Sequence, residues 1–220
     1  MNILFFGASS QIARSISKNI KFKIYGISKK NFKHNYISLY KISNYSKREI
    51  KRVLNKKKIK FDHIIFFNGI YEHSLLRNYN KDDFYNVLNI NFSTIISSAL
   101  TIIENKFLKE HGSICFISSK AADNIELGNA YYSLTKKLLN ISAKLLSKEF
   151  RNLYRFNCIS SGFIKSKMSD EILNYYTSEQ KKNILKRQNN LFIPKSKLIK
   201  TIYSLCYNNK INGKVIKLHR

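Results

Sequence analysis

The sequence predicts an α/β fold in three layers, a doubly wound parallel β-sheet with helices on both faces, built as a single domain. Short apolar runs alternate with longer segments of helical periodicity along the whole chain. Strands that alternate with helices pair in parallel, and their crossover helices cover both faces of the sheet. The chain has 220 residues, of which 44% are hydrophobic. This size suits one domain with a substantial core.

Seven short runs have the length and the β-branched or aromatic content of strands. The predicted strands lie at 2–6, 23–27, 36–40, 63–67, 113–118, 155–160 and 214–218. Apolar residues recur at three- and four-residue intervals between these runs, as they do on one face of a helix. The predicted helices lie near 11–20, 45–57, 81–105, 130–150 and 195–207.

The polar segment 166–190 is compatible with helix but contains no strand. In an α/β domain, an insertion near the strand ends is well placed to cover the site. We therefore expect this segment to be a substrate lid.

The charge is strongly positive, with 40 Lys+Arg against 13 Asp+Glu and a formal net charge of +27. A basic surface can serve nucleic acid or another acidic partner. The lysines are spread through nearly every segment, however, and they form no single stripe with interleaved aromatic residues. This distribution favours solvated lysines over a dedicated nucleic-acid surface.

Cysteine and histidine placement excludes some classes of site. Cys115, Cys158 and Cys206 lie far apart, and the five histidines have no metal-ligand spacing. Unpaired thiols suit a reducing compartment, and we expect no metal. No basic leader precedes the first apolar run, and no run approaches the roughly 18 apolar residues of a membrane span. These features predict a cytoplasmic protein without a membrane span.

A turn of small residues joins the first strand to the first helix in the stretch FFGASSQIARSI. Dinucleotide-binding folds place the pyrophosphate at such a turn, where a helix begins and backbone donors are free. Gly7 would supply the tight turn, while Ser9 and Ser10 would donate their hydroxyls. A turn with one glycine is a weak signal by itself.

The end of the second strand, GISKK, bears on the choice of cofactor. Folds that prefer NAD place an acidic residue about twenty residues beyond the turn. Ser28, Lys29 and Lys30 stand there instead, with no carboxylate. A basic strand end favours a 2′-phosphate, so NADP(H) is expected over NAD(H).

Two tyrosines and two lysines stand together in NAYYSLTKK, residues 129–137. Residues four apart share one face of a helix, so Tyr132 and Lys136 are neighbours. Three other features occur in order along the chain: Asn91 in NVLNINF, Ser119 at the end of SICFISS, and the glycine of SSGFIKSKM.

This order of motifs resembles the short-chain dehydrogenase/reductase family, from Asn2 to about Leu218. The resemblance implies a Rossmann-like fold and an NAD(P)(H)-dependent oxidoreductase that interconverts a carbonyl and an alcohol. Its catalytic tetrad would be Asn91, Ser119, Tyr132 and Lys136, since Ser118 lies one residue too far from the tyrosine. By the same resemblance, the cofactor would contact Gly7, Ser9, Ser10, Gln11, Ile12, Ser28, Lys29, Asn68, Gly69, Tyr132, Lys136 and Ile164.

Several positions depart from the family's pattern. The family's Gly-x-x-x-Gly-x-Gly turn reads Gly7, Gln11 and Ala13, so a bulky glutamine is expected beside the pyrophosphate. The Asn-Asn-Ala-Gly motif is half retained at 66–69, Pro-Gly reads Ser-Gly at 161–162, and Lys41 stands where an acidic residue often contacts adenine. The cofactor contacts have diverged while the proton-transfer residues remain, which favours a divergent working enzyme.

The chemistry explains why these residue types belong together. Nicotinamide supplies hydride to a carbonyl carbon, and the protein must supply a proton to the oxygen. A lysine ammonium about 4 Å from a phenol contributes roughly 4 kcal/mol at an effective dielectric of 20, enough to lower the phenol's pKa by up to about three units. Burial opposes part of this shift. Tyr132 is therefore expected to titrate near working pH.

The family resemblance assigns the remaining roles. Lys136 would hold the nicotinamide ribose, Ser119 would bind the substrate oxygen, and Asn91 would hold a water that links Lys136 to solvent. Backbone at 162–164 would lie against the nicotinamide. Family members commonly form dimers or tetramers through their long helices, so we expect a homodimer or homotetramer through 81–105 and 130–150.

Two classes of small or carrier-linked substrate suit a basic protein. A 3-oxoacyl group on acyl carrier protein would suit it because that carrier is acidic. A keto-sugar derivative would use the same positive field for its phosphates. The alternative is a non-enzymatic module of the same fold that binds nucleic acid or another acidic partner.

Overall fold

The computed structural model describes residues 1–56, 59–186 and 192–219, and it contains the predicted parallel sheet. The strands pair in parallel in the order β3-β2-β1-β4-β5-β6-β7. They are β1 (Asn2–Phe6), β2 (Lys23–Ser28), β3 (Ser38–Lys41), β4 (Phe61–Phe66), β5 (Leu108–Ser119), β6 (Arg155–Ser161) and β7 (Val215–Lys217). The strand order reverses between β1 and β4, the place where open α/β sheets bind their ligands.

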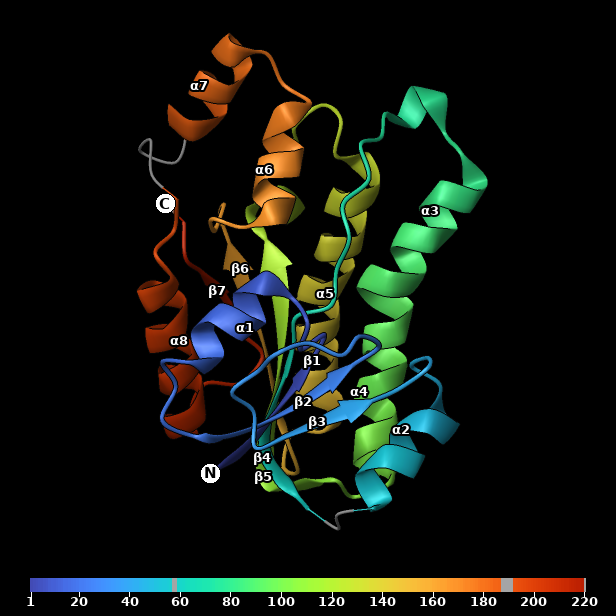
Figure 1. Cartoon of the computed structure of the whole chain (residues 1–220), viewed down its shortest axis with the longest axis vertical. Helices are drawn as coiled ribbons and strands as arrows, with labels where there is room; N and C mark the ends of the chain where they lie inside the picture. Colours follow the sequence, from blue (N-terminus) through green and yellow to red (C-terminus); the bar gives the residue numbers. More distant parts are fainter. Residues whose placement is uncertain (57–58, 187–191, 220) are drawn as a thin grey trace.

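Helices form a layer on each face of the sheet (Figure 1). They are α1 (Gln11–Ser17), α2 (Lys47–Asn55), α3 (Lys81–Leu88), α4 (Thr94–Glu104), α5 (Ala130–Glu149), α6 (Lys167–Asn174), α7 (Ser178–Lys186) and α8 (Lys195–Tyr207). Shorter helical turns are η1 (Leu76–Asn78), η2 (Asn89–Ser93) and η3 (Lys120–Ala122). Helices α1 and α8 pack on one face, while α2, α4 and α5 pack on the other.

The strand β1 is apolar from Ile3 to Phe6 because helices cover both of its faces. Leu4 and Phe6 belong to the core on the side of α2, α4 and α5, whereas Ile3 and Phe5 belong to the core on the side of α1 and α8. Successive side chains point to opposite faces of a strand, so a strand covered on both faces needs apolar residues at every position. The fold class predicted from such runs is confirmed.

Two elements differ most from their predicted form. The strand β5 begins at Leu108, five residues before the predicted run, because Leu108 pairs with Phe61 ahead of an irregularity in the β4–β5 register. The predicted helix 81–105 is divided into α3, the π-helical turn η2 and α4. The segment 166–186 forms α6 and α7, and the end of the predicted lid at 187–190 lies outside the described residues.

The stretch Lys81–Glu104 is the one helix in the described ranges that is long and apolar enough to cross a membrane by length and composition. This is weak support for a span, because core helices of soluble proteins pass the same test. Within the fold, Ile95, Ala99 and Ile102 of α4 lie in the core beside α2 and α5.

Candidate active site

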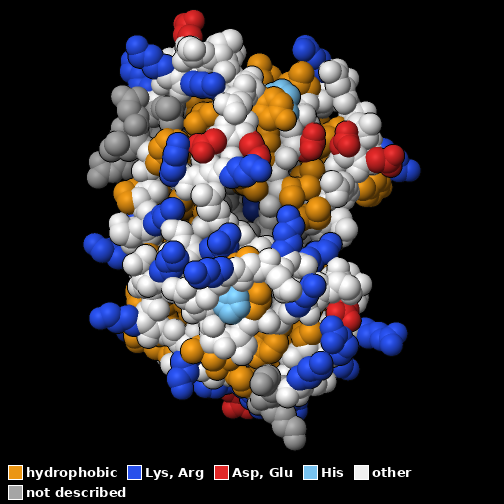
Figure 2. Space-filling model, viewed as in Figure 1, with side chains coloured by type: hydrophobic (Ala, Val, Ile, Leu, Met, Phe, Trp, Pro, Cys, Tyr) orange, Lys and Arg blue, Asp and Glu red, His pale blue; other side chains and the backbone are white. Residues whose placement is uncertain are grey.

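A cavity of about 790 Å³ opens at the carboxyl ends of β1, β4, β5 and β6, beneath α6. Figure 2 shows a hollow near the centre of this face, with Lys and Arg side chains gathered around it. The volume lies within the roughly 300–1,000 Å³ of small-molecule and cofactor sites. The cavity lies at the carboxyl ends of the strands, next to the turn between β1 and α1.

The first turn is tight because Gly7 adopts a φ of +67°. A Cβ atom at this position would lie 2.8 Å from the backbone nitrogen of Asn68, so only glycine lets the two loops approach. Ser10 caps α1 by accepting a hydrogen bond from the Ala13 amide at 3.2 Å. The turn therefore presents Ser9 and Ser10 at the wall of the cavity.

Tyr132 and Lys136 meet one turn apart on α5, as their spacing predicts. The Lys136 Nζ lies 5.4 Å from the centroid of the Tyr132 ring and donates to the Ile117 carbonyl oxygen at 3.0 Å. Ser119, at the end of β5, hydrogen-bonds to the Tyr132 phenol. Ser118 instead donates its hydroxyl to the Lys136 carbonyl at 3.0 Å. The structure thus brings Ser119, Tyr132 and Lys136 together in the cavity wall.

Asn91 lies behind these residues, in the π-helical turn η2, and is completely buried. Its Oδ1 accepts from the Ile70 amide at 2.8 Å, and its Nδ2 donates to the Ile70 carbonyl at 2.9 Å and to Thr135 Oγ1 at 3.2 Å. A π-helical turn inside a helix frequently marks a functional site. Asn91 therefore anchors the loop after β4 beside Lys136, while its predicted water remains a prediction.

Gly69 lies close to both Asn91 and Lys136. A Cβ atom there would sit 3.3 Å from Lys136 Nζ and 3.6 Å from Asn91 Oδ1. The ammonium would have to shift by a few tenths of an ångström to accommodate the first of these contacts. The loop after β4, which Asn91 holds, therefore passes directly beside Lys136.

Burial shifts the pKa values of both Tyr132 and Lys136. It raises the pKa of Tyr132 to about 12, and the hydrogen bond from Ser119 opposes this only in part. Burial also lowers the pKa of Lys136 to about 8. The predicted fall in the tyrosine pKa is therefore wrong for the protein alone, because desolvation outweighs any attraction to an ammonium that faces a main-chain carbonyl. The phenol keeps its proton at neutral pH and can donate a hydrogen bond.

Most of the predicted cofactor contacts reach the cavity. Those that line it are Ser9, Ser10, Gln11, Ile12, Asn68, Gly69, Tyr132, Lys136 and Ile164. Gly7 lies outside this lining and shapes the turn. The contacts predicted at the end of β2 need correction: Ser28 is buried and accepts a hydrogen bond from the Lys30 amide at 3.0 Å, and it is Lys30, not Lys29, that lines the cavity.

Sequence reasoning missed Arg14, which lines the cavity three residues after Gln11. Its guanidinium lies 5.1 Å from the centroid of the Phe32 ring. The spacing of three residues, which brings side chains to one face of a helix, was the signal available in the sequence. Arg14 and Lys30 together make the β1–β2 end of the cavity positive.

Sequence reasoning also missed two tyrosines at the other end of the cavity. The Tyr71 ring lies 5.7 Å from the Tyr132 ring, and its hydroxyl donates to the Gly128 carbonyl at 2.9 Å. Tyr176, after α6, donates to the Leu127 carbonyl at 2.8 Å. These residues stand in irregular segments, where periodicity gives no direction for a side chain.

The cavity fits a dinucleotide. Asn68 lines the cavity, and its buried Oδ1 atom has no hydrogen-bond partner among the described residues. Lys136 lines the cavity, and its Nζ has further donor capacity for ribose hydroxyls, because an ammonium carries three N–H bonds and the bond to the Ile117 carbonyl uses one. No cluster of metal-ligating side chains occurs within the residues that the structure describes.

Residues 46–195, more than half of the chain, match a family model described as "Enoyl-(Acyl carrier protein) reductase". A solved short chain dehydrogenase family protein from Francisella tularensis superimposes with a TM-score of 0.82 at 18% identity, covering 98% of this chain and 96% of that one. The chain belongs to the short-chain dehydrogenase/reductase family.

Two further comparisons identify proteins that resemble this chain. A 3-oxoacyl-[acyl-carrier-protein] reductase from Chlamydia pneumoniae is 28% identical over 127 residues, which are 57% of this chain and 51% of that protein. The match thus spans about half the length of that relative. A 4-hydroxyisoleucine dehydrogenase complexed with NADH has a TM-score of 0.78 at 20% identity, covering 98% of this chain and 95% of that chain. At these identities the solved structures show the shared fold.

Proposed function

We propose that this short-chain dehydrogenase/reductase is an NAD(P)(H)-dependent oxidoreductase that reduces a keto substrate with NADPH. One observation carries the proposal: Ser119, Tyr132 and Lys136 converge in the wall of a cavity that also exposes the first β–α turn. A bound nicotinamide would supply the hydride, and the protein's groups would manage the proton.

The chain's own residues would bind the substrate and the cofactor and supply the proton. The Tyr132 phenol, protonated at neutral pH, donates a hydrogen bond and then its proton to the carbonyl oxygen. Ser119 provides a second donor for the charge that develops on that oxygen. Lys136 binds the cofactor's ribose and returns a proton toward Tyr132, while Asn91 holds the loop that keeps Lys136 in place.

The preference for NADPH rests on Arg14 and Lys30. Both line the β1–β2 end of the cavity, where dinucleotide folds place the adenosine ribose. A 2′-phosphate would add charge-assisted bonds to these two cations, while a free hydroxyl would not. The solved 4-hydroxyisoleucine dehydrogenase is complexed with NADH, so the fold does not itself require a 2′-phosphate.

The substrate we favour is a 3-oxoacyl group on an acidic carrier, with a keto-sugar derivative as the second class. The name of the Chlamydia relative supports the first class. The substrate end of the cavity is lined by the apolar or aromatic side chains of Tyr71, Met168, Ile172 and Tyr176, which suits an acyl chain. The lysines around the hollow suit an acidic carrier (Figure 2).

The lid and the assembly belong to the same proposal. Residues 166–190 would close over the substrate. The α5 residues Leu134, Leu138, Ile141 and Leu145 form an exposed apolar stripe at helical spacing, which supports a homodimer or homotetramer through this helix. We further propose that the protein works in the cytoplasm.

Tyr131 and Tyr132 are adjacent in the chain, so a variant of one can serve as the control for the same variant of the other. Tyr132→Phe should abolish oxidation of NADPH with a panel of 3-oxoacyl and keto-sugar substrates while leaving NADPH binding intact. Tyr131→Phe is the control, because the Tyr131 hydroxyl accepts a hydrogen bond from the Asn80 amide at 2.7 Å, away from the cavity. Retained turnover in Tyr132→Phe would exclude the mechanism.

The alternative, a non-enzymatic binding module, predicts the opposite results. It requires salt-sensitive binding of nucleic acid or another acidic partner and no saturable binding of NADPH. A fluorescence titration with NADPH and with NADH, at two salt concentrations, separates the two functions.

A further inference from the structure

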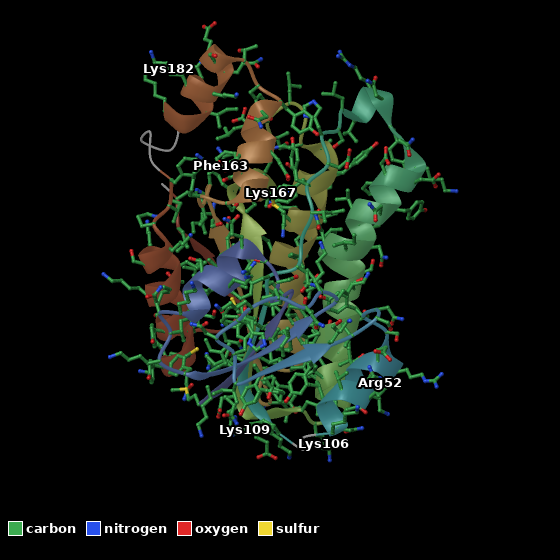
Figure 3. The ribbon with its side chains drawn as sticks, viewed as in Figure 1. Arg52, Lys106, Lys109, Phe163, Lys167 and Lys182 are labelled. Atoms are coloured by element: carbon green, nitrogen blue, oxygen red, sulfur yellow. The ribbon has the colours of Figure 1, made fainter. Side chains whose placement is uncertain are left out.

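Gln11 makes a hydrogen bond that joins α1 to α6 at the edge of the cavity. Its Oε1 accepts a hydrogen bond from the backbone amide of Lys167, 156 residues away in the chain, at 2.6 Å. Gln11 is the first residue of α1, and Lys167 is the first residue of α6. Figure 3 places Lys167 at the base of α6, above α1. The bond thus joins the start of the cofactor turn's helix to the start of the lid.

The amide that Gln11 binds is one that α6 cannot satisfy itself. The first four N–H groups of a helix have no partner within the helix. Ser166 accepts from the Ser169 amide at 3.2 Å, and the Ser169 hydroxyl accepts from the Ser166 amide at 2.9 Å, which completes a capping box. The Lys167 amide lies outside this box. Gln11 supplies its acceptor from another element and so adds to the cap of α6.

The far end of α6 is also fastened. Tyr176, two residues beyond the helix, donates to the Leu127 carbonyl at 2.8 Å, and the Tyr175 ring stacks on His73 with ring centroids 4.5 Å apart. The helix is therefore tied to the loops on the substrate side at its end and to the first turn at its beginning. Residues of α6 line the cavity between these two attachments.

We propose that Gln11 is a positioning residue that fastens the lid helix α6 to the cofactor turn, so that a dinucleotide leaves only after this bond opens. The part of this inference that concerns the cofactor rests on the proposed function, while the ordering of α6 by Gln11 does not. The bond has no counterpart with glycine at position 11, because glycine has no side-chain acceptor.

The test pairs Gln11→Leu with Gln180→Leu. Leucine keeps much of the bulk and removes the acceptor. Gln180 accepts from the Thr177 amide at 2.9 Å, so its substitution removes a bond of the same type that stays within the lid segment. Hydrogen–deuterium exchange over 166–176 is measured without cofactor, and the NADPH dissociation rate is measured by displacement with excess NADP.

We expect Gln11→Leu to speed both exchange at 166–176 and NADPH dissociation by roughly three- to tenfold, the range for one hydrogen bond. Gln180→Leu should leave both unchanged. Gln11→Glu, which retains an acceptor, should restore slow exchange at 166–176 in the absence of cofactor.

Two results would overturn the inference. Exchange at 166–176 in Gln11→Leu equal to wild type would show that the bond does not order α6. Tighter NADPH binding by Gln11→Leu, or by Gln11→Gly, would show that the glutamine obstructs the diphosphate. If the wild-type protein binds no NADPH, the proposed function fails, but the exchange experiment still decides whether Gln11 orders the lid.

Discussion

The Lys136 ammonium faces the ring of Tyr132, 5.4 Å from its centroid, and gives a hydrogen bond to the Ile117 carbonyl. Helical spacing predicts that these two side chains are neighbours, and they are. It does not predict that the lysine is 4% exposed, or that burial lowers its pKa to about 8. The ammonium loses its proton near pH 8, within the range of ordinary enzyme assays, so its pKa governs two measurable properties of the site.

The first property is the pH dependence of reduction. Lys136 returns a proton toward Tyr132 only while it is protonated, so kcat/KM for reduction should fall as pH rises through about 8. Tyr132, with its pKa near 12, keeps its proton throughout this range. A profile of kcat/KM from pH 6 to pH 10 measures this fall. A flat profile would contradict the role of Lys136 as the proton donor to Tyr132. Arginine stays charged across this range, so any activity that remains in Lys136→Arg should no longer fall as pH rises through about 8.

The second property is stability. Burying a lysine whose pKa falls from 10.5 to about 8 means that the unfolded state binds more protons between these pH values, so wild-type stability should rise with pH across this window. The full rise is about 3 kcal/mol. Lys136→Met removes the charge, and at pH 7 it should raise the free energy of unfolding by about 1–3 kcal/mol while abolishing activity.

Urea denaturation at pH 7 and pH 10 measures this difference between wild type and Lys136→Met. The stability gain should be largest at pH 7 and should shrink at pH 10, where the wild-type amine is neutral. A variant that is less stable than wild type at pH 7 would show that the bond to Ile117 outweighs the burial of the charge.

Cofactor preference tests the positive end of the cavity. Lys30→Glu should raise the Kd for NADPH by tenfold or more and change the Kd for NADH much less, because only NADPH carries a 2′-phosphate. Lys29→Glu is the matched control on the neighbouring residue, which does not line the cavity among the described residues. Equal losses in the two variants would indicate a general field and no direct contact.

The sequence was sufficient for the fold class and for the placement of Tyr132 and Lys136 as neighbours on one helix. Those predictions depend on period-2 and period-3.6 patterns and on spacing within one helix, which are local properties of the chain. The strand β1 and the pair Tyr132–Lys136 are examples. Both are fixed by residues within a few positions of each other.

The sequence was insufficient where a contact joins distant segments. The bond between Gln11 and Lys167 spans 156 residues, and no local pattern encodes it. The direction of the Tyr132 pKa depends on how much water the packed walls exclude, which spacing cannot give. The π-helical turn at Asn91 arises from one residue more in the turn than an α-helix holds, and its partners Ile70 and Thr135 lie on other elements.

Acid sensitivity should arise from His63, which lies on β4 and hydrogen-bonds through Nδ1 to Ser113 Oγ at 2.8 Å. Burial and, to a smaller extent, the positive charge of Arg155 lower its pKa to about 4, against the opposing charge of Asp62. Between about pH 6.5 and pH 4, His63 is protonated in the unfolded chain but stays neutral in the folded protein. Stability should therefore be lost as pH falls from about 6.5 to about 4.

At pH 5 this loss should amount to about 2 kcal/mol relative to pH 7. His63→Asn should abolish that part of the pH dependence, as measured by urea denaturation at pH 7 and pH 5, even if it lowers stability at both. His111→Asn is the matched control, because His111 is exposed and its φ of 57° is one that asparagine tolerates. If His63→Asn and wild type lose the same stability between pH 7 and pH 5, the acid sensitivity arises from other groups, and the burial of His63 as a neutral side chain is not its cause.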